Sequence, residues 1–220
     1  MRLRVFSHQQ IFTFATNLLV FFLTMESDSA LLIAASRMDK DALVRIFDLY
    51  SRPLYNYALR ICGDPMLADH IVGDVFAKLL EQLAAGYGPR ANLRSYLYES
   101  AYHRMIDEVR YSKPKAPLEV ATQLPLDAYL SMEDCILFKQ VLDAVQHKLS
   151  ADQRHVIVLR FLEGFSLRET AAILNKDVDH IKVIQNRAIA KLRRLLESQG
   201  RKNPLVPWMT RHVSEALGIG

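Results

Sequence analysis

The sequence predicts an all-α protein built from two small helical domains joined by an extended linker. Apolar residues recur at three-to-four spacing over long stretches, and no window shows sustained strand alternation. A segment with three prolines, at positions 114, 117 and 125, has no clear period and separates the two helical stretches. We therefore predict a first domain over 27–111, a linker over 112–134 and a second domain over 135–200, and we leave the tail 201–220 unassigned.

The 220-residue chain has an ordinary globular composition, with 50% hydrophobic and 24% charged residues and a net charge of +4. Its two cysteines, Cys62 and Cys135, have no metal-ligand spacing and are too few for a disulfide scaffold. Unpaired thiols fit a reducing compartment, so we expect a cytoplasmic protein. No phosphate-binding loop or nucleophile motif is present. We therefore predict no catalytic residue, metal ligand, cofactor or small-molecule substrate.

Residues 1–26 form an apolar extension unlike the rest of the chain. Arg2 and Arg4 precede an apolar stretch from Ile11 to Leu23, as in a signal peptide, but no A-x-A cleavage site follows. The stretch is also shorter than the ~20 residues that span a bilayer. Three interpretations stay open: translated upstream sequence before a true start at Met25, a short anchor or interfacial helix, or a cleaved signal.

Three helices are expected in the first domain. One contains Ala42 and Ile46 at helical spacing, and the next begins at Asp64–Pro65, with proline at the first helical position. A glycine-containing loop over 86–89 comes before a third helix over about 93–110.

The second domain shows a helical pattern from Phe138 to Leu149 and two capping boxes. Ser150 precedes Gln153 by three positions and Ser166 precedes Glu169 likewise, so each serine is expected to start a helix. The helix that follows Ser150 is expected to stop at Gly164. A polar turn over 175–177 then leads into a long final helix.

The final helix carries one buried and one basic face. Between residues 181 and 202 seven lysines and arginines face a single glutamate. A short helix, a tight turn and a basic second helix are typical of a helix-turn-helix, whose second helix enters the DNA major groove. Phosphates bind cations, and base edges need a few directional side chains near the helix start. The alternative from charge alone is a solvated basic helix.

The other two charged segments differ in character. The helix over 93–110 interleaves aromatic and basic residues, which fits either stacking of unpaired bases or core packing. The helix that begins at Asp64 is acidic, with Asp69, Asp74 and Glu81 near apolar residues, and suits a protein partner. The linker is acidic too, since Leu118 to Asp134 contains no lysine or arginine.

Five segments, in this order, resemble a known family. They are "LVRIFDLYSRPLYNYALRICG" (43–63), "ADHIVGDVFAKL" (68–79), "LRSYLYESAYHRMIDEVR" (93–110), "LSADQRHVIVLRFL" (149–162) and "IKVIQNRAIAKLRRLL" (181–196). Together they resemble the bacterial RNA polymerase sigma factors of the extracytoplasmic-function (ECF) group of the sigma-70 family, which keep only regions two and four. The resemblance covers about Asp39 to Glu197.

The chain departs from the family pattern at several positions. Gly73 stands where the family has Gln in the polymerase-binding segment, Tyr96 where it has Trp, and His103 where it has Asn. The turn before the final helix contains no glycine, and Asp177 or Asp179 is expected to cap that helix instead.

The resemblance implies a sigma factor that binds core RNA polymerase, directs it to the −10 and −35 promoter elements and promotes strand opening. The implied partners are the β and β′ subunits of core polymerase, promoter DNA in duplex and single-stranded form, and an anti-sigma factor. The implied polymerase-binding residues are Asp69, His70, Asp74 and Phe76. The implied −10 residues are Arg94, Tyr96, Tyr98, His103, Arg104, Asp107 and Arg110. The implied −35 residues are Arg168, Lys182, Val183, Asn186, Arg187 and Lys191.

Three other functions stay open. A stand-alone helix-turn-helix regulator would bind duplex DNA tightly without polymerase, but it would have no use for the acidic helix or the aromatic-basic helix. A membrane-anchored signalling protein would depend on residues 1–24. A helical adaptor that does not bind DNA is disfavoured by the basic final helix.

Overall fold

The computed structural model describes residues 29–111 and 142–197, and its regular elements there are all helical. The all-α prediction is therefore confirmed. The predicted extension over 1–26, the linker over 112–134 and the tail over 201–220 lie outside the described residues.

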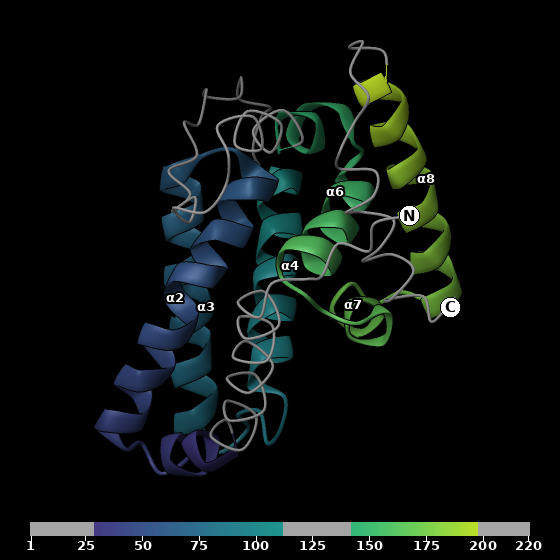
Figure 1. Ribbon diagram of the computed structural model, residues 1–220. Coiled ribbons are helices and arrows are strands. Elements are labelled where there is room, and N and C mark those ends of the chain that lie inside the picture. Colours follow the sequence, from purple (N-terminus) through teal and green to yellow (C-terminus); the bar gives the residue numbers. More distant parts are fainter. Residues whose placement is uncertain (1–28, 112–141, 198–220) are drawn as a thin grey trace, which may run out of the picture.

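The first domain is a three-helix bundle (Figure 1). Its helices are α2 (Lys40–Cys62), α3 (Pro65–Ala84) and α4 (Leu93–Tyr111), and a short helix over residues 29–35 precedes them. Each long helix contacts both of the others. Large apolar side chains from all three helices are fully buried at the centre, because each helix presents an apolar line to its neighbours.

The ends of α2 and α3 are determined by local sequence. The Asp39 side chain accepts a hydrogen bond from the Ala42 backbone N–H at 2.8 Å, and α2 ends at Gly63 with a φ of 69°. Asp64 then caps α3, with Pro65 at its first position, as predicted. Positive φ favours glycine because an L side chain is strained there.

The second domain contains a helix over 142–148 followed by α6 (Ala151–Ile157), the π-helical turn η1 (Val158–Leu162), α7 (Leu167–Ile173) and α8 (Val178–Glu197). The π-helical turn is a correction to the predicted single helix that stops at Gly164. The Glu163 backbone N–H donates to the Val158 carbonyl at 2.9 Å, a spacing of five residues rather than four. Gly164, two residues after this turn, has a φ of 73°.

Both predicted capping boxes are present. The Ser150 hydroxyl accepts from the Gln153 backbone N–H at 3.4 Å, and the Gln153 side chain accepts from the Ser150 N–H at 3.2 Å. The corresponding distances for Ser166 and Glu169 are 3.2 and 2.7 Å. Short helices depend strongly on such caps, because capping satisfies backbone donors that a helix cannot satisfy itself.

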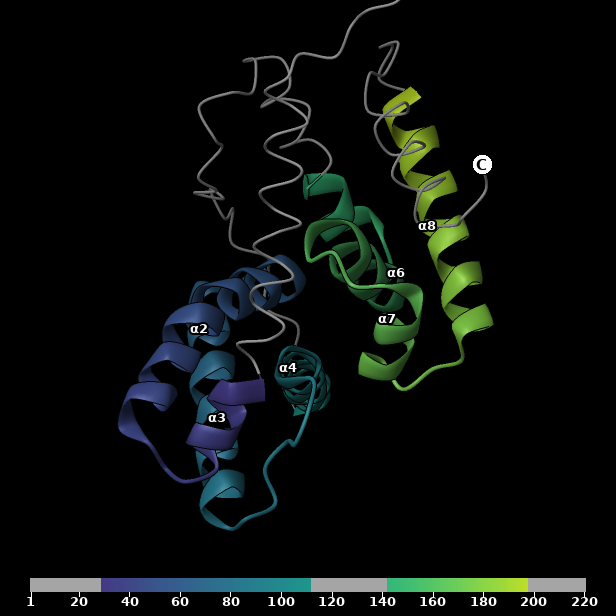
Figure 2. The ribbon, with the colours of Figure 1, turned by 60° about the horizontal axis from the view of Figure 1, so that its bottom comes forward.

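α7 packs against α4, and α6 and η1 contact α2, whereas α8 lies beyond them, on the side away from the bundle (Figures 1 and 2). The buried apolar residues of both domains form one continuous cluster. The fold therefore covers one face of α4 and leaves the outer face of α8 uncovered.

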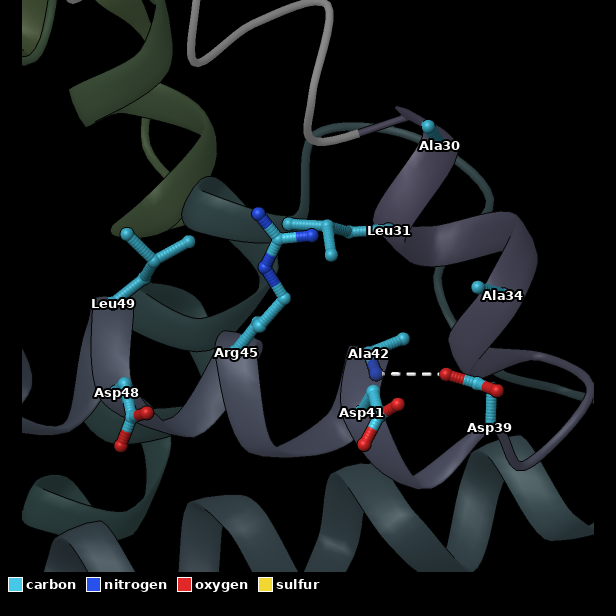
Figure 3. Close-up of a pocket in the computed structure, with 9 residues that line it drawn as sticks. All are labelled: Ala30, Leu31, Ala34, Asp39, Asp41, Ala42, Arg45, Asp48 and Leu49. Carbon is cyan, nitrogen blue, oxygen red and sulfur yellow. Dashed lines mark hydrogen bonds between the residues drawn. The ribbon is translucent and has the colours of Figure 1, made fainter.

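A pocket of about 590 Å³ lies between the 29–35 helix and the first half of α2 (Figure 3). Its apolar lining includes Leu31, Ala34 and Ala42, and the backbone N–H of Ala42 donates to the side chain of Asp39, which also lines the pocket.

No described helix is long and apolar enough to span a bilayer. In the same residues, no three His, Cys, Asp or Glu side chains gather as metal ligands would.

We predict that Ser166→Ala lowers the free energy of unfolding by about 1 kcal/mol, because it removes the cap of α7. Ser166→Asp, which retains a capping oxygen, should remain near the wild-type value. Urea denaturation followed by circular dichroism measures both. Equal stability of the alanine and aspartate variants would contradict the capping role.

Candidate nucleic-acid and polymerase-binding surfaces

The outer face of α8 is basic and exposed. Its inner face is apolar, and Ile181, Ala188 and Leu192 are fully buried against the second domain. This arrangement follows from the three-to-four spacing of apolar residues along α8. The predicted −35 residues Lys182, Val183, Asn186, Arg187 and Lys191 are all exposed on the outer face.

The helix-turn-helix geometry comes from α7, a turn and α8. The turn contains Asn175 at a φ of 49°, a conformation that asparagine tolerates better than most residues. Arg168 is exposed near the start of α7. The Nζ of Lys182 lies 3.0 Å from the Asp179 carboxylate, an exposed pair near the start of α8 that solvent screens.

Sequence reasoning missed the residues that hold α8 in place. Gln185 is fully buried, and its Oε1 accepts from Nε of Arg160 at 3.0 Å. Arg160 also donates to the Phe165 carbonyl, so one guanidinium connects η1, the following loop and α8. Desolvation lowers the pKa of Arg160. The inward position of Gln185 among apolar neighbours was the available signal.

Two of the predicted −10 residues at the start of α4, Arg94 and Tyr98, are turned toward the second domain, whereas Tyr96 faces α3. Tyr98 is fully buried, and its hydroxyl donates to Oε2 of Glu163 at 2.6 Å. The Arg94 guanidinium lies 3.9 Å from the centre of the Phe165 ring and donates to the Glu163 carbonyl. Tyr96 is half-buried and donates to Oε1 of Gln82 at 2.7 Å.

The remaining −10 candidates lie farther along α4. His103 is exposed, 3.8 Å from Glu99, and Asp107 is exposed as well. Nε of Arg104 lies 2.5 Å from the Asp74 carboxylate, and this hydrogen bond raises the pKa of Arg104. Arg110 belongs to α4, but its side chain lies outside the described part of the chain.

The structure divides the predicted polymerase-binding residues of α3. Asp69 and His70 are exposed, whereas Asp74 pairs with Arg104 and, at 3.4 Å, with His70. Phe76 is buried and packs on Phe47 of α2, with ring centroids 4.9 Å apart.

Two features of the α3 surface bear on its use as a binding face. A Cβ added at Gly73 would meet no atom within 4 Å, so this position opens to solvent. Sequence reasoning also missed three exposed apolar residues on α2 and α3, of which Val44 is 58%, Phe47 49% and Leu80 41% exposed. Exposed apolar residues bordered by polar and charged ones are common in protein-binding surfaces.

A buried aromatic cluster joins the two domains. The Tyr57 hydroxyl and Nδ1 of His155 lie 2.8 Å apart, and the Tyr102 ring packs edge-on against His155 at 5.0 Å. Tyr98 lies 5.2 Å from Tyr57 and 4.8 Å from Phe165. Burial, and then the charge of Arg154, lower the pKa of His155 to about 4. The imidazole is therefore neutral at physiological pH.

A helical bundle beside a helix-turn-helix with a free basic recognition helix defines a DNA-binding protein. Comparison with models of known protein families shows which kind of DNA-binding protein this is. The model for Sigma-70 region 2 matches residues 46–114, and the model for Sigma-70, region 4 matches residues 147–194. The chain belongs to the ECF group of sigma-70 family RNA polymerase sigma factors.

Curated relatives agree with this assignment. The chain is 32% identical over 187 residues to the ECF sigma factor BldN of Streptomyces coelicolor, covering 80% of this chain and 70% of that protein. It is 29% identical over 171 residues to the ECF sigma factor SigW of Bacillus subtilis, covering 72% and 90%.

Solved structures agree on the fold. CnrH, solved in complex with the cytosolic domain of CnrY, superimposes with a TM-score of 0.59 at 23% identity, covering 78% of this chain and 97% of that one. RpoE of Bartonella quintana, solved with the anti-sigma factor NepR, gives 0.54 at 22% identity, covering 70% and 95%.

We predict that acid weakens the fold through His155. Below the ordinary histidine pKa of about 6.5 the unfolded chain takes up a proton that the folded chain does not, so stability falls as pH falls toward 4 and is flat above about 7. The loss attributable to this group between pH 7.5 and 4.5 is about 2–3 kcal/mol.

His155→Asn provides the matched comparison, because asparagine can still bond to Tyr57 but does not titrate. Urea unfolding of both proteins across this pH range isolates the histidine from the carboxylates that titrate nearby. The same pH dependence in both proteins would rule out the proposed role of His155.

Proposed function

We propose that this sigma factor uses three separate surfaces to bring core RNA polymerase to promoters: α8 for the −35 duplex, α3 for polymerase and α4 for the −10 element. The observation that carries the proposal is the exposed basic face of α8 in a chain that belongs to the ECF sigma factors. An outer face of this kind attracts phosphates and presents side chains to a major groove.

At the −35 element, Lys182, Val183, Asn186 and Arg187 lie at the start of α8, where a recognition helix meets base edges. Arg168 and Lys191 lie where phosphates would approach. Amide and guanidinium groups discriminate bases by paired hydrogen bonds, whereas lysine contributes mainly charge.

Polymerase would dock on the outer face of α3. Asp69 and His70 contribute polar contacts, and the exposed Val44, Phe47 and Leu80 contribute apolar area. Asp74 and Phe76 act less directly, since Asp74 bridges α3 to Arg104 of α4 and Phe76 supports the Phe47 ring. We propose the β′ and β subunits as partners, as the family resemblance implies.

At the −10 element, α4 would hold unpaired bases of the opened strand. Aromatic and basic side chains suit that task, because unstacked bases regain about 1–3 kcal/mol each on an aromatic face. Tyr96, His103, Arg104, Asp107 and Arg110 lie along α4. Arg94 and Tyr98 complete the set of candidates, although the second domain covers them here.

We infer that the protein is an initiation factor rather than an enzyme, that it acts in the cytoplasm, and that polymerisation belongs to core polymerase. We also propose an anti-sigma partner, supported by the similar RpoE structure, which was solved with an anti-sigma factor. A stand-alone duplex-binding regulator is the weaker alternative, because the family match extends over both sigma regions.

Reconstitution with core polymerase tests the function. We expect the protein to direct transcription from a promoter library, with start sites downstream of one shared two-part motif, for chains that begin at Met1 or at Met25. Duplex binding by the protein alone should be weak. Random start sites despite binding to core polymerase would refute promoter selection, and tight specific duplex binding without polymerase would favour the stand-alone regulator.

We predict that Asp69→Arg weakens core polymerase binding at least 10-fold while leaving the unfolding transition unchanged, because Asp69 is exposed and reversing its charge opposes a complementary partner. Asp143→Arg, at another exposed carboxylate outside α3, is the control. Fluorescence anisotropy with labelled protein measures both affinities. An equal effect of the two substitutions would argue against docking on α3.

A further inference from the structure

A buried carboxylate of the second domain contacts two helices of the first. The Glu163 side chain is 8% exposed, and its Oε1 lies 2.7 Å from Nη1 of Arg60 on α2. Its Oε2 accepts from the Tyr98 hydroxyl of α4 at 2.6 Å, and its backbone carbonyl accepts from Arg94. One residue of the second domain therefore contacts both α2 and α4 of the first.

Further contacts surround this carboxylate. Nη1 of Arg154 donates to the Ile61 carbonyl at 2.6 Å, so a second polar contact runs from α6 to α2. The aromatic cluster of Tyr57, Tyr98, Tyr102, His155 and Phe165 fills the space between the domains. A buried charge is stable only when paired, so displacing the domains would expose or orphan several groups together.

The same contacts include some unfavourable features. Desolvation raises the pKa of Glu163 despite the opposing bonds and charges of Tyr98, Arg60 and Arg94. Nε of Arg60 and Nε of Arg154 are buried without a hydrogen-bond partner in the described part of the chain. Leaving buried polar atoms unpaired costs free energy, so the two Nε atoms would gain hydrogen bonds from solvent or a partner if the domains separated.

The consequences for the two DNA-binding surfaces are unequal. Arg94 and Tyr98 are occupied by Glu163 and Phe165, and Tyr102 is 9% exposed beneath His155. In contrast, Lys182 and Val183 on α8 remain exposed, with α8 on the side away from the bundle (Figure 2). Contact between the domains therefore covers the part of α4 proposed to bind single-stranded DNA, and it leaves the face of α8 proposed to bind duplex DNA exposed.

We propose that Glu163 holds this sigma factor in a closed, self-inhibited arrangement, in which the single-strand surface of α4 is sequestered by the second domain until the domains separate. Separation frees Arg94 and Tyr98 for phosphates and bases. The biological meaning of this inference rests on the proposed function, but the closed arrangement itself is testable without polymerase or DNA.

The first test measures the size of the full-length protein by small-angle X-ray scattering. Glu163→Arg and Arg60→Glu each place like charges together, so each should increase the radius of gyration and maximum dimension relative to wild type. The double variant R60E/E163R restores opposite charges and should return toward wild type. Asp143→Asn, which removes an exposed carboxylate, should scatter like wild type.

Circular dichroism shows whether each variant retains its helices. Glu163→Gln keeps the side-chain volume and serves where a charge reversal unfolds the chain, with the same direction of change expected. Wild-type scattering already typical of separated domains, or unchanged dimensions in E163Q and in every folded charge-reversal variant, would overturn the closed arrangement.

The second test measures affinity for a fluorescein-labelled single-stranded oligonucleotide of mixed sequence, because closure covers Arg94 and Tyr98 of the single-strand surface. A protein that must open before binding loses affinity in proportion to its open fraction, so opening variants should bind the oligonucleotide about 10-fold or more tightly than wild type if less than a tenth of the protein is open. Equal affinity in variants that scattering shows to be open would overturn the inhibitory role. Failure of every form, wild type included, to bind the oligonucleotide would refute the proposed single-strand role of α4, while the scattering alone would still decide the closed arrangement.

Discussion

The burial of the Glu163 carboxylate connects the second domain to two helices of the first. A carboxylate removed from water needs cationic and hydrogen-bonding partners, and here Arg60 and Tyr98 supply them from two different helices. These contacts orient the loop after η1 against the bundle. The positions of α7 and α8 follow, because Arg160 connects that same loop to Gln185 of α8.

This arrangement separates the surfaces that a sigma factor needs. The basic face of α8 points away from the bundle, the outer face of α3 is exposed, and the aromatic part of α4 lies between the domains (Figure 1). The Arg104–Asp74 pair connects α4 to α3 within the first domain. A partner bound to α3 would therefore lie next to an ion pair that reaches α4, the helix proposed to hold opened DNA.

Local sequence predicted where several helices begin and which residues of α8 are exposed. Capping boxes at Ser150 and Ser166 and the Asp64–Pro65 start act within a single turn, so their residues specify them directly. The π-helical turn at 158–162 had no such signal, since its widened backbone is stabilised by contacts of Arg160 with distant residues.

The sequence alone determined that α8 has one apolar and one basic face, because its apolar residues repeat with the helical period. On α4 the aromatic and basic residues surround the helix, and periodicity could not separate those that face solvent from those that pack. Only the tertiary structure decided that Tyr98 is buried and His103 exposed, because the second domain covers one side of α4. Burial of this kind depends on residues far away in sequence, since Phe165 contacts Tyr98 and Arg94 across 67 and 71 positions.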